Sequence, residues 1–426
     1  MPASSGHALT ARLHASGFAL ADSNFYSCHT ASDGRVFYTL CCHQIDSHAR
    51  VYGYEPQRDR LFLAGDLGAV VGEAGKRTIP QGKSHVPFFE SEGGLYLATH
   101  YGFFQSVGGK ESPAGVPEGY QQYPGGHFLR YDLASGRWHD YGTSPEAEGV
   151  LSLGMDTRRR RLYGLTWPTG LLIRVDLDAG SVRNLGPVCR RGEAGSGPTY
   201  LCLCRSLAVV PHTGRVYFTL ATGDIRRYDP DTDRVSTLTH ESLRRDILGA
   251  WKPHTPGHQG YNWRDILWHP DHGVFYGIHP KSAYLFLFDP QTERVRLIDR
   301  ICAQELRASG QYEPFRYGYL TLRLGPDGRT LYYLTGGPPH HVEEGGVGET
   351  THLVTYDLHT GRYADHGFLR LEDGRFPTMS QSLAIGTDGR LYACPWIERP
   401  ASPGQDRGRT QVDLISFANP LAQEGR

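Results

Sequence analysis

The sequence predicts an all-β fold made of repeated four-stranded units that close into a ring. A hairpin pattern of a short apolar strand, a turn and an aromatic-rich strand occurs seven times along the chain. A second hairpin with an Asp-Pro or Asp-Leu turn often follows the first. The composition agrees, because 53 Gly and 25 Tyr among 426 residues favour turns and strands over helices.

The first hairpins set the number of repeats. They occupy residues 29–43, 84–101, 151–170, 205–223, 265–280, 320–337 and 380–396. Their turns lie near Gly34, Gly93, Arg159, Gly214, Gly273, Gly328 and Gly389. Successive turns are further apart than the roughly 40–50 residues of compact propeller repeats, so we expect long loops. The sequence therefore predicts one domain over residues 1–426, a single seven-bladed β-propeller.

The second hairpins complete the blades. They are predicted at 128–142, 172–186, 225–238, 285–298 and 353–367. We expect residues 412–418 to finish the last blade, with an N-terminal strand near 8–12 closing the ring. Two β-sandwiches are the alternative fold, but they do not explain one two-hairpin unit repeated across the chain.

Composition and charge exclude several classes of partner. The chain has 44 Lys and Arg against 45 Asp and Glu, so it does not depend on a polyanionic partner, and nucleic acid is not an expected ligand. No apolar run is long enough for a membrane helix, and the N-terminus lacks the pattern of a signal peptide. We expect a cytoplasmic protein as written, or a periplasmic or secreted one if a leader was removed. Eight Cys without a framework spacing favour a reducing compartment.

Residues that flank the first hairpins are expected to meet at one mouth of the central channel. Cross-strand partners in a hairpin have a constant sum of residue numbers, so pairing outward from each turn predicts the pairs to within about one residue. The predicted pairs are Asn24–His43, His85–His100, Val150–Trp167, Arg205–Thr222, Arg264–His279, Tyr319–Gly336 and Gln381–Trp396. Such a concave cluster of His, Arg, Gln, Tyr and Trp is typical of a binding site, although a solvated polar rim is the alternative.

His85 and His100 form the sharpest predicted pair. Two neighbouring imidazoles bind a metal ion together, or one acts as a base while the other binds substrate. A structural hydrogen-bonding role is the alternative. Lys83, two residues before His85, adds a cation, and Tyr101, directly after His100, adds a phenol.

Arg205 and Arg264 begin the inner strands of neighbouring repeats. A guanidinium in this position suits a bidentate carboxylate or sulfate. Structural salt bridges to Asp224 or Asp265 are the alternative. His279, opposite Arg264, is a further candidate ligand or base.

Aromatic residues are also expected at the mouth. The side chains of Trp167, Trp263 and Trp396 offer flat faces for stacking on sugar rings. His43 and Gln381 are further candidates for substrate binding. An insertion at 250–263, with His254, His258 and Tyr261, is expected to form a loop over the mouth.

Other catalytic patterns are missing. A glycoside hydrolase usually brings two carboxylates to its cleft, and the predicted mouth has no convincing pair, since Glu398 and Asp265 lie only nearby. The cysteines Cys41, Cys42, Cys202 and Cys204 lack the spacing of a zinc site.

The segment SHVPFFESEGGLYLATHYG (84–102) resembles one blade of propeller-type polysaccharide lyases, especially ulvan lyases and, more distantly, oligogalacturonate lyase. The resemblance implies that His or Tyr abstracts the proton alpha to a uronate carboxylate, that Arg neutralises the carboxylate, and that the glycosidic oxygen leaves by β-elimination. Ulvan lyases place a facing Tyr and Arg on the next blade, where this chain has Val150 and Trp167. Oligogalacturonate lyase holds a divalent metal ion through His and Gln, a role that the resemblance assigns here to His85, His100, His279 and Gln381.

The leading hypothesis is therefore a lyase that acts on an acidic, uronate-containing saccharide. Arg205 or Arg264 is expected to bind the carboxylate, His85 or His100 to take the proton, and Tyr319 or Tyr101 to return one. One divalent ion (Mn, Zn or Ca) is the expected cofactor if any is used, and no organic cofactor is expected. The alternatives are a non-catalytic propeller that binds a glycan or protein, and a metal-assisted lyase or hydrolase of a small molecule. The sequence does not indicate an oligomeric state.

Overall fold

The structure is a computed structural model that describes residues 7–107, 110–113, 115–249, 259–280, 282–310, 321–336, 350–398 and 410–422. Strands dominate it, and the predicted all-β class is confirmed. The helices are α1 (Leu67–Val70), α2 (Gln304–Ser309), and the 3-10 helices η1 (Pro56–Arg58), η2 (Pro145–Ala147), η3 (Gly192–Ala194), η4 (Gly197–Thr199) and η5 (Asp246–Leu248). No helix in the described ranges has the length and apolar character needed to cross a membrane.

Five separate antiparallel sheets of four strands lie in the described part of the chain. The first two are β2 (Cys28–Thr30), β3 (Val36–Leu40), β4 (Arg50–Glu55) and β5 (Arg60–Asp66); and β6 (Phe89–Ser91), β7 (Gly94–Ala98), β10 (His127–Asp132) and β11 (Trp138–Thr143). The third is β12 (Gly149–Asp156), β13 (Arg161–Trp167), β14 (Leu171–Asp176) and β15 (Ser181–Pro187). The fourth and fifth are β16 (Ala208–Val209), β17 (Val216–Thr219), β18 (Asp224–Asp229) and β19 (Arg234–Ser242); and β20 (Asp265–His269), β21 (Val274–Ile278), β22 (Tyr284–Asp289) and β23 (Arg294–Arg300).

A larger sheet joins the two ends of the chain. Its strands are β24 (Thr321–Leu324), β25 (Thr330–Leu334), β26 (His352–Asp357), β27 (Tyr363–Leu371), β1 (Ala8–His14), β33 (Leu414–Ala418), β30 (Arg390–Ala393) and β29 (Ala384–Ile385). The N-terminal β1 pairs antiparallel with the C-terminal β33 and parallel with β27. This confirms the predicted pairing of both chain ends, and the five predicted second hairpins are all present.

Two small sheets lie beside these. One is β28 (Pro377–Met379), β31 (Trp396–Glu398) and β32 (Thr410–Val412), and the other is the hairpin of β8 (Phe104–Val107) and β9 (Lys110–Pro113).

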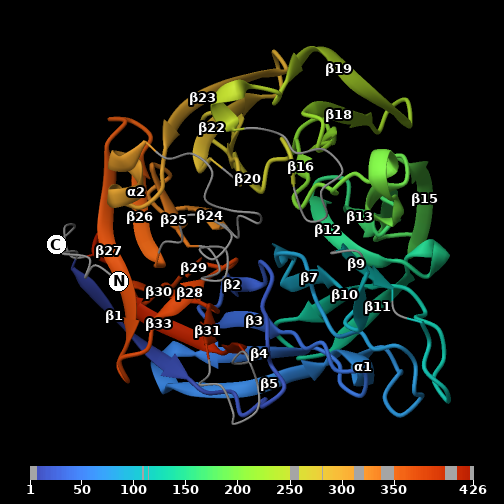
Figure 1. The fold of residues 1–426 in the computed structure, drawn as a ribbon. Helices are drawn as coiled ribbons and strands as arrows, with labels where there is room; N and C mark the ends of the chain where they lie inside the picture. The colour runs from blue at the N-terminus through green and yellow to red at the C-terminus, as the bar shows by residue number, and fades with distance from the viewer. Residues whose placement is uncertain are drawn as a thin grey trace.

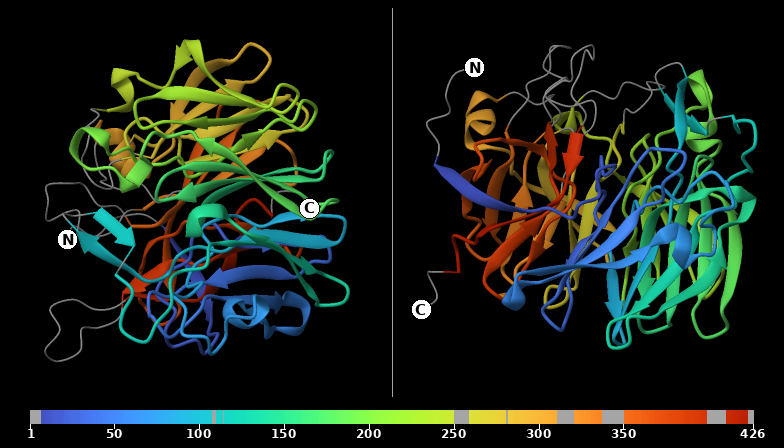
Figure 2. Two further views of the ribbon diagram at one scale, coloured as in Figure 1. Left: turned by 90° about the vertical axis from the view of Figure 1, so that its right-hand side faces the viewer. Right: turned by 90° about the horizontal axis from the view of Figure 1, so that it is seen from below.

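The sheets are arranged around a common centre (Figure 1). The first strands β2, β12, β16, β20 and β24 lie towards the centre, while the last strands β5, β15, β19, β23 and β27 lie at the periphery. In the view from below, the β8–β9 hairpin and α2 lie on the same side of the ring (Figure 2).

The hydrophobic core fills the spaces between neighbouring sheets. Phe37 of β3 contacts Tyr131 of β10 with ring centroids 5.4 Å apart, and Tyr217 of β17 contacts Phe288 of β22 at 4.9 Å. Because each sheet packs on the next, the inner ends of the strands converge on one region.

The strand ladders confirm the register of three predicted hairpins. Phe89 pairs with Tyr96 in the β6–β7 hairpin, Asp265 pairs with Ile278 in the β20–β21 hairpin, and Thr321 pairs with Leu334 in the β24–β25 hairpin. In all three hairpins the turn fixes the register as the sequence predicts.

Most predicted pairs at the mouth are displaced, because the chain leaves the regular ladder before it reaches the mouth. The structure pairs Ser23 with Cys41, Lys83 with His100, Gly149 with Trp167 and Met379 with Trp396. The predicted Asn24–His43, His85–His100 and Gln381–Trp396 pairs are therefore wrong. The predicted Val150–Trp167 pair is displaced by one residue. The β16–β17 ladder ends at Ala208 and Tyr217, short of the predicted Arg205–Thr222 pair. The Tyr319–Gly336 pair includes a residue outside the described ranges.

All eight cysteines lie in the described part, where each is buried and none forms a disulfide.

Candidate functional site

A cavity of about 260 Å³ collects side chains from several sheets, and we call it the mouth cavity. Its lining consists of Phe25, His43, Lys83, His85, His100, Phe104, Glu111, Leu151, Trp167, Glu193, Tyr200, Arg205, Gln259, Arg264 and Trp396. Eight of these residues are among those that the sequence predicts for the mouth.

His85 has a defined tautomer in this cavity. Its Nδ1 lies 3.0 Å from the carbonyl oxygen of Leu151, which only accepts hydrogen bonds, so Nδ1 carries the hydrogen and Nε2 has a lone pair. The ring stacks on Phe25 with centroids 4.6 Å apart. Burial, followed by the charge of Arg205, holds the pKa of His85 well below its usual range. His85 is therefore a neutral imidazole with a fixed orientation.

His100 is the second histidine of the cavity. Its ring lies edge-on to that of His85 with centroids 5.7 Å apart, and edge-on to the indole of Trp167 at 5.5 Å. Burial, followed by the charge of Lys83, holds the pKa of His100 well below its usual range. The two histidines are thus brought together as predicted, although they are not cross-strand partners.

Lys83 places a buried ammonium group in the cavity. Its Nζ lies 4.2 Å from the ring centroid of Phe104 and 5.2 Å from that of Phe25, so two aromatic faces contact the cation. The residue is 3% exposed, and burial lowers its pKa. The described residues give its Nζ no ion pair within bonding distance, although Glu111 lies in the same lining.

Arg205 is held by a glutamate that the sequence analysis missed. Its Nη1 donates to Glu193 Oε1 at 2.7 Å and to Leu203 O at 3.0 Å. Glu193 Oε2 also accepts from Trp167 Nε1 at 3.0 Å. Burial raises the pKa of Glu193, but the charge and hydrogen bond of Arg205, together with the hydrogen bonds from Leu203 N–H and Cys202, lower it. The carboxylate therefore orients both an arginine and a tryptophan of the cavity.

Arg264 is held by an uncharged side chain. Its Nη2 donates to Gln381 Oε1 at 2.7 Å, and its guanidinium lies 5.3 Å from the ring centroid of Tyr26. The residue is 1% exposed. Gln381, which we predicted as a ligand of substrate or metal, instead positions Arg264 and is not part of the lining.

Aromatic side chains form the walls of the cavity. Trp167 and Trp396 line it as predicted, and Phe25 and Phe104 add two faces that the sequence analysis did not anticipate. Phe104 comes from the β8–β9 hairpin.

Besides Gln381, three further predicted site residues lie outside the lining. Trp263 is fully buried, donates to Ser206 O and stacks near Phe286, so it belongs to the core. Tyr101 packs on Tyr123 outside the lining.

His279 also lies outside the cavity and is fully buried. Its Nδ1 contacts Ser282 Oγ at 2.9 Å and its Nε2 donates to Gly260 O at 3.1 Å. With both nitrogens hydrogen-bonded, its predicted role as a ligand or base is not supported by this geometry. Tyr261 is described but does not line the cavity, whereas Tyr319, His254 and His258 lie outside the described ranges.

The predicted metal site requires several ligand side chains close together. No group of three or more His, Cys, Asp or Glu in the described ranges is placed to hold a metal ion. Of the four predicted metal ligands, His279 and Gln381 bond to protein groups instead. The described residues therefore do not fit the predicted metal site.

Two of the missed residues come from segments that carry no strand pattern. Glu193 lies in η3, and Glu111 lies on β9 in a stretch that interrupts the repeat. Pairing outward from the first turns cannot reach either position. The only sequence signal is that both are carboxylates in long insertions between predicted hairpins.

No family model and no curated protein matches this sequence. Solved structures do match along most of the chain. A streptogramin B lyase has a TM-score of 0.52 at 11% identity, covering 96% of this chain and 97% of its own. A catalytically inactive virginiamycin B lyase from Staphylococcus aureus with quinupristin has a TM-score of 0.52 at 9% identity, covering 96% and 99%. The periplasmic gluconolactonase PpgL of Pseudomonas aeruginosa has a TM-score of 0.51 at 17% identity, covering 90% and 99%.

These similar structures are β-propellers, and at such low identity the likeness concerns the fold alone. The predicted propeller architecture is thereby confirmed. None of the three is an ulvan lyase or an oligogalacturonate lyase, so the resemblance to those families stays a prediction.

Proposed function

We propose that this chain is a seven-bladed propeller enzyme, a carbon–oxygen lyase that cleaves a uronate-containing saccharide by β-elimination in the mouth cavity. The observation that carries the proposal is the combination, in one cavity, of a neutral histidine of fixed tautomer with buried cations. The cations suit an anionic substrate, and the basic nitrogen of His85 suits the removal of a proton from a weakly acidic carbon.

The first requirement is to bind and neutralise the carboxylate. Lys83 and Arg264 are both at most 3% exposed and line the same cavity. A carboxylate that enters it would gain charge-assisted hydrogen bonds in a setting where water competes little. Arg205 bonds to Glu193, and we assign the carboxylate to Lys83, with Arg264 in the same lining.

The second requirement is a base. His85 Nε2 has a lone pair, and Nδ1 is fixed by Leu151 O, so the ring takes up a proton without reorienting. Neutralising the carboxylate acidifies the carbon beside it, because the same cations stabilise the enolate-like charge of the transition state. His100, at 5.7 Å between ring centroids, is assigned to substrate binding.

The third requirement is to hold the sugar ring. Trp167 is fixed by its bond to Glu193, and its indole faces the cavity together with Trp396. Flat apolar faces suit the C–H faces of a pyranose.

A lyase or hydrolase of a small molecule, acting without the predicted metal site, is the second candidate. The volume of about 260 Å³ favours it, since this lies just below the roughly 300–1,000 Å³ of typical ligand pockets. Turnover of a small molecule without turnover of any uronate polymer would support this candidate over the polysaccharide lyase.

The proposed function is tested with purified protein and a panel of polygalacturonate, alginate, ulvan and glucuronan. We expect ultraviolet absorbance to rise as the carbon–carbon double bond forms beside the carboxylate. Lys83→Met should lower kcat/KM by about 10²-fold or more, because the enolate-like charge loses a buried cation. Lys76→Met, at an exposed position outside the cavity, is the matched control and should leave kcat/KM unchanged.

No unsaturated product from any polymer of the panel would contradict the lyase. Binding of a polymer without product, unchanged by Lys83→Met, would instead support a non-catalytic glycan-binding propeller.

A further inference from the structure

A second cavity, of about 370 Å³, adjoins the mouth cavity. It is lined by Ala19, Leu20, Ala21, Asp22, Ser23, His43, Gln44, Trp396 and Thr410. His43 and Trp396 line both cavities. His43 and Trp396 therefore both lie at the boundary between the two spaces.

Asp22 fixes the orientation of His43. Its Oδ1 lies 2.8 Å from His43 Nδ1, and its Oδ2 accepts from the backbone N–H of His43 at 3.1 Å. Burial raises the pKa of Asp22, but the hydrogen bonds and charge of His43, together with the hydrogen bond from Ser23, lower it, so the carboxylate is ionised at neutral pH. Thr410 Oγ1 donates to the backbone oxygen of Asp22 at 2.8 Å and braces the pair.

The Asp22–His43 pair has the features of a proton donor. Because an ionised carboxylate only accepts, Nδ1 carries a hydrogen and Nε2 is left for the cavities. No described residue is hydrogen-bonded to Nε2, and the edge of the ring packs against Phe104 with centroids 5.1 Å apart. A carboxylate at one ring nitrogen supports the imidazolium that forms when the other nitrogen takes up a proton.

An elimination needs a proton donor besides its base. The phenol of Tyr101, predicted for this role, lies outside the mouth cavity. Tyr319, the other predicted donor, lies outside the described ranges. Among the described residues of the lining, His43 is the imidazole that is bonded to a carboxylate.

We propose that His43, oriented by Asp22, protonates the departing glycosidic oxygen at the boundary of two sugar subsites; this inference rests on the proposed elimination. The uronate ring occupies the mouth cavity, and the leaving sugar occupies the second cavity beside Trp396. The smallest good substrate is therefore a disaccharide with a uronate on the side of the mouth cavity.

His85 Nε2 takes the proton from the carbon beside the carboxylate, and that electron pair forms the carbon–carbon double bond. The bond between the β-carbon and the glycosidic oxygen breaks, and the oxygen keeps its electron pair and receives the proton from His43 Nε2. His85 gains one proton and His43 loses one, and exchange with water restores both.

The test compares two leaving groups in His43→Ala and Asp22→Asn. One substrate is an oligouronate, and the other is a synthetic uronate with 4-nitrophenolate at the β-carbon, a leaving group that needs no proton. We expect His43→Ala to lower kcat on the oligouronate by about 10²–10⁴-fold, as loss of a general acid does. On the nitrophenolate substrate its kcat should stay near the wild-type value. Asp22, a positioning residue, should show the same pattern with a smaller loss on the oligouronate.

His29→Ala is the matched control. Its imidazole is 30% exposed and bonded to a carboxylate, Glu90, at 3.1 Å, much as the 29% exposed His43 is bonded to Asp22, but it lines neither cavity. It should behave as wild type on both substrates.

Equal losses on both substrates, or no loss on either, in His43→Ala would overturn the donor role and leave the proposed lyase standing. A wild-type protein that forms no unsaturated product from either substrate would overturn both proposals.

Discussion

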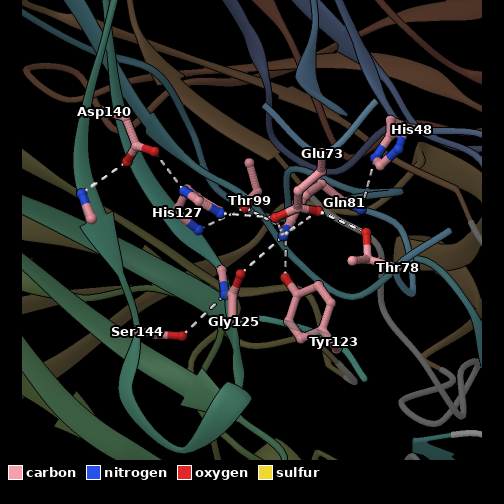
Figure 3. Close-up of polar contacts among 12 residues, drawn as sticks. His48, Glu73, Thr78, Gln81, Thr99, Tyr123, Gly125, His127, Asp140 and Ser144 are labelled. Atoms are coloured by element: carbon pink, nitrogen blue, oxygen red, sulfur yellow. Dashed lines mark hydrogen bonds and ion pairs between the residues drawn. The ribbon is translucent and has the colours of Figure 1, made fainter. Parts of the chain in front are cut away.

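His85 and His127 are both buried histidines, yet their surroundings leave His85 neutral and make His127 a cation. His85 lies among Arg205, Arg264 and Lys83, and burial with these cations holds its pKa well below the usual range. At the start of β10, His127 lies between Glu73 Oε1, 3.0 Å from its Nε2, and Asp140 Oδ2, 2.7 Å from its Nδ1 (Figure 3).

Burial alone lowers the pKa of His127, but the bonds to Asp140 and Glu73 outweigh it and raise the pKa to about 9. With a carboxylate at each nitrogen, both nitrogens donate and the ring is an imidazolium. Glu73 also accepts from Gln81 Nε2 at 3.1 Å, which extends the network between loops (Figure 3). Burial thus does not decide the charge of a histidine here, and the neighbouring charges do.

The difference in charge indicates different roles for the two histidines. A neutral imidazole with a lone pair facing a cavity is available to a substrate, whereas an imidazolium held between two carboxylates joins parts of the fold. We expect changes at His85 to act on turnover and changes at His127 to act on the free energy of unfolding.

The largest expected effect is that of His85→Gln on turnover. Gln keeps a donor for Leu151 O but has no basic nitrogen, so kcat on an active uronate polymer should fall about 10²–10⁴-fold. The midpoint of chemical unfolding should stay close to that of the wild type. A variant that unfolds earlier and keeps its kcat would assign His85 to stability and remove the contrast with His127.

The sequence predicts most of the strand pairing, but it does not predict the charged neighbours that make His85 and His127 differ. Hairpin signals depend on residues close in sequence, so the second hairpins and the pairing of β1 with β33 could be predicted. The partners of Arg205 and His127 could not, because Glu193 and Glu73 reach them from loops that have no periodic pattern. His85 and His100 were correctly placed together even though the exact pairing was off by two residues.

The predicted roles of Trp263 and His279 show a second limit. Pairing outward from a turn assigns a residue to a strand end, but where the chain leaves the regular ladder, alternation no longer fixes which way a side chain points. Both residues point into the protein, where Trp263 packs in the core and His279 bonds to a backbone carbonyl. Only the packing of neighbouring sheets distinguishes them from Arg264.

The next largest effect is the pH dependence of stability. The pKa of His127 is about 9 in the folded state and about 6.5 when unperturbed, so the folded state binds its proton more tightly. The stabilisation is complete below about pH 6.5 and is lost as pH rises towards about 9, with a change on the order of 3 kcal/mol.

Urea unfolding at about pH 6 and about pH 9.5 measures this change. In His127→Gln the protein should be less stable at the lower pH, and the fall between the two pH values should shrink. An equal fall in the variant and the wild type would assign the pH dependence to other groups.

The smallest expected effect concerns Glu111, the carboxylate of the β8–β9 hairpin that lines the mouth cavity. Its charge raises the pKa of Lys83 and opposes the entry of an anion. Glu111→Gln should therefore strengthen binding of a uronate by about 2- to 5-fold, the range expected for one solvent-accessible charge.

Titration calorimetry with galacturonate at low and high salt measures this gain, which should diminish as salt screens the charges. Glu118→Gln, exposed in the same insertion but outside the lining, is the matched control. A gain of equal size in both variants would mean that net charge alone attracts the anion. A gain confined to Glu111→Gln would show that the anion lies beside Lys83, where the cations that keep His85 neutral also bind the substrate.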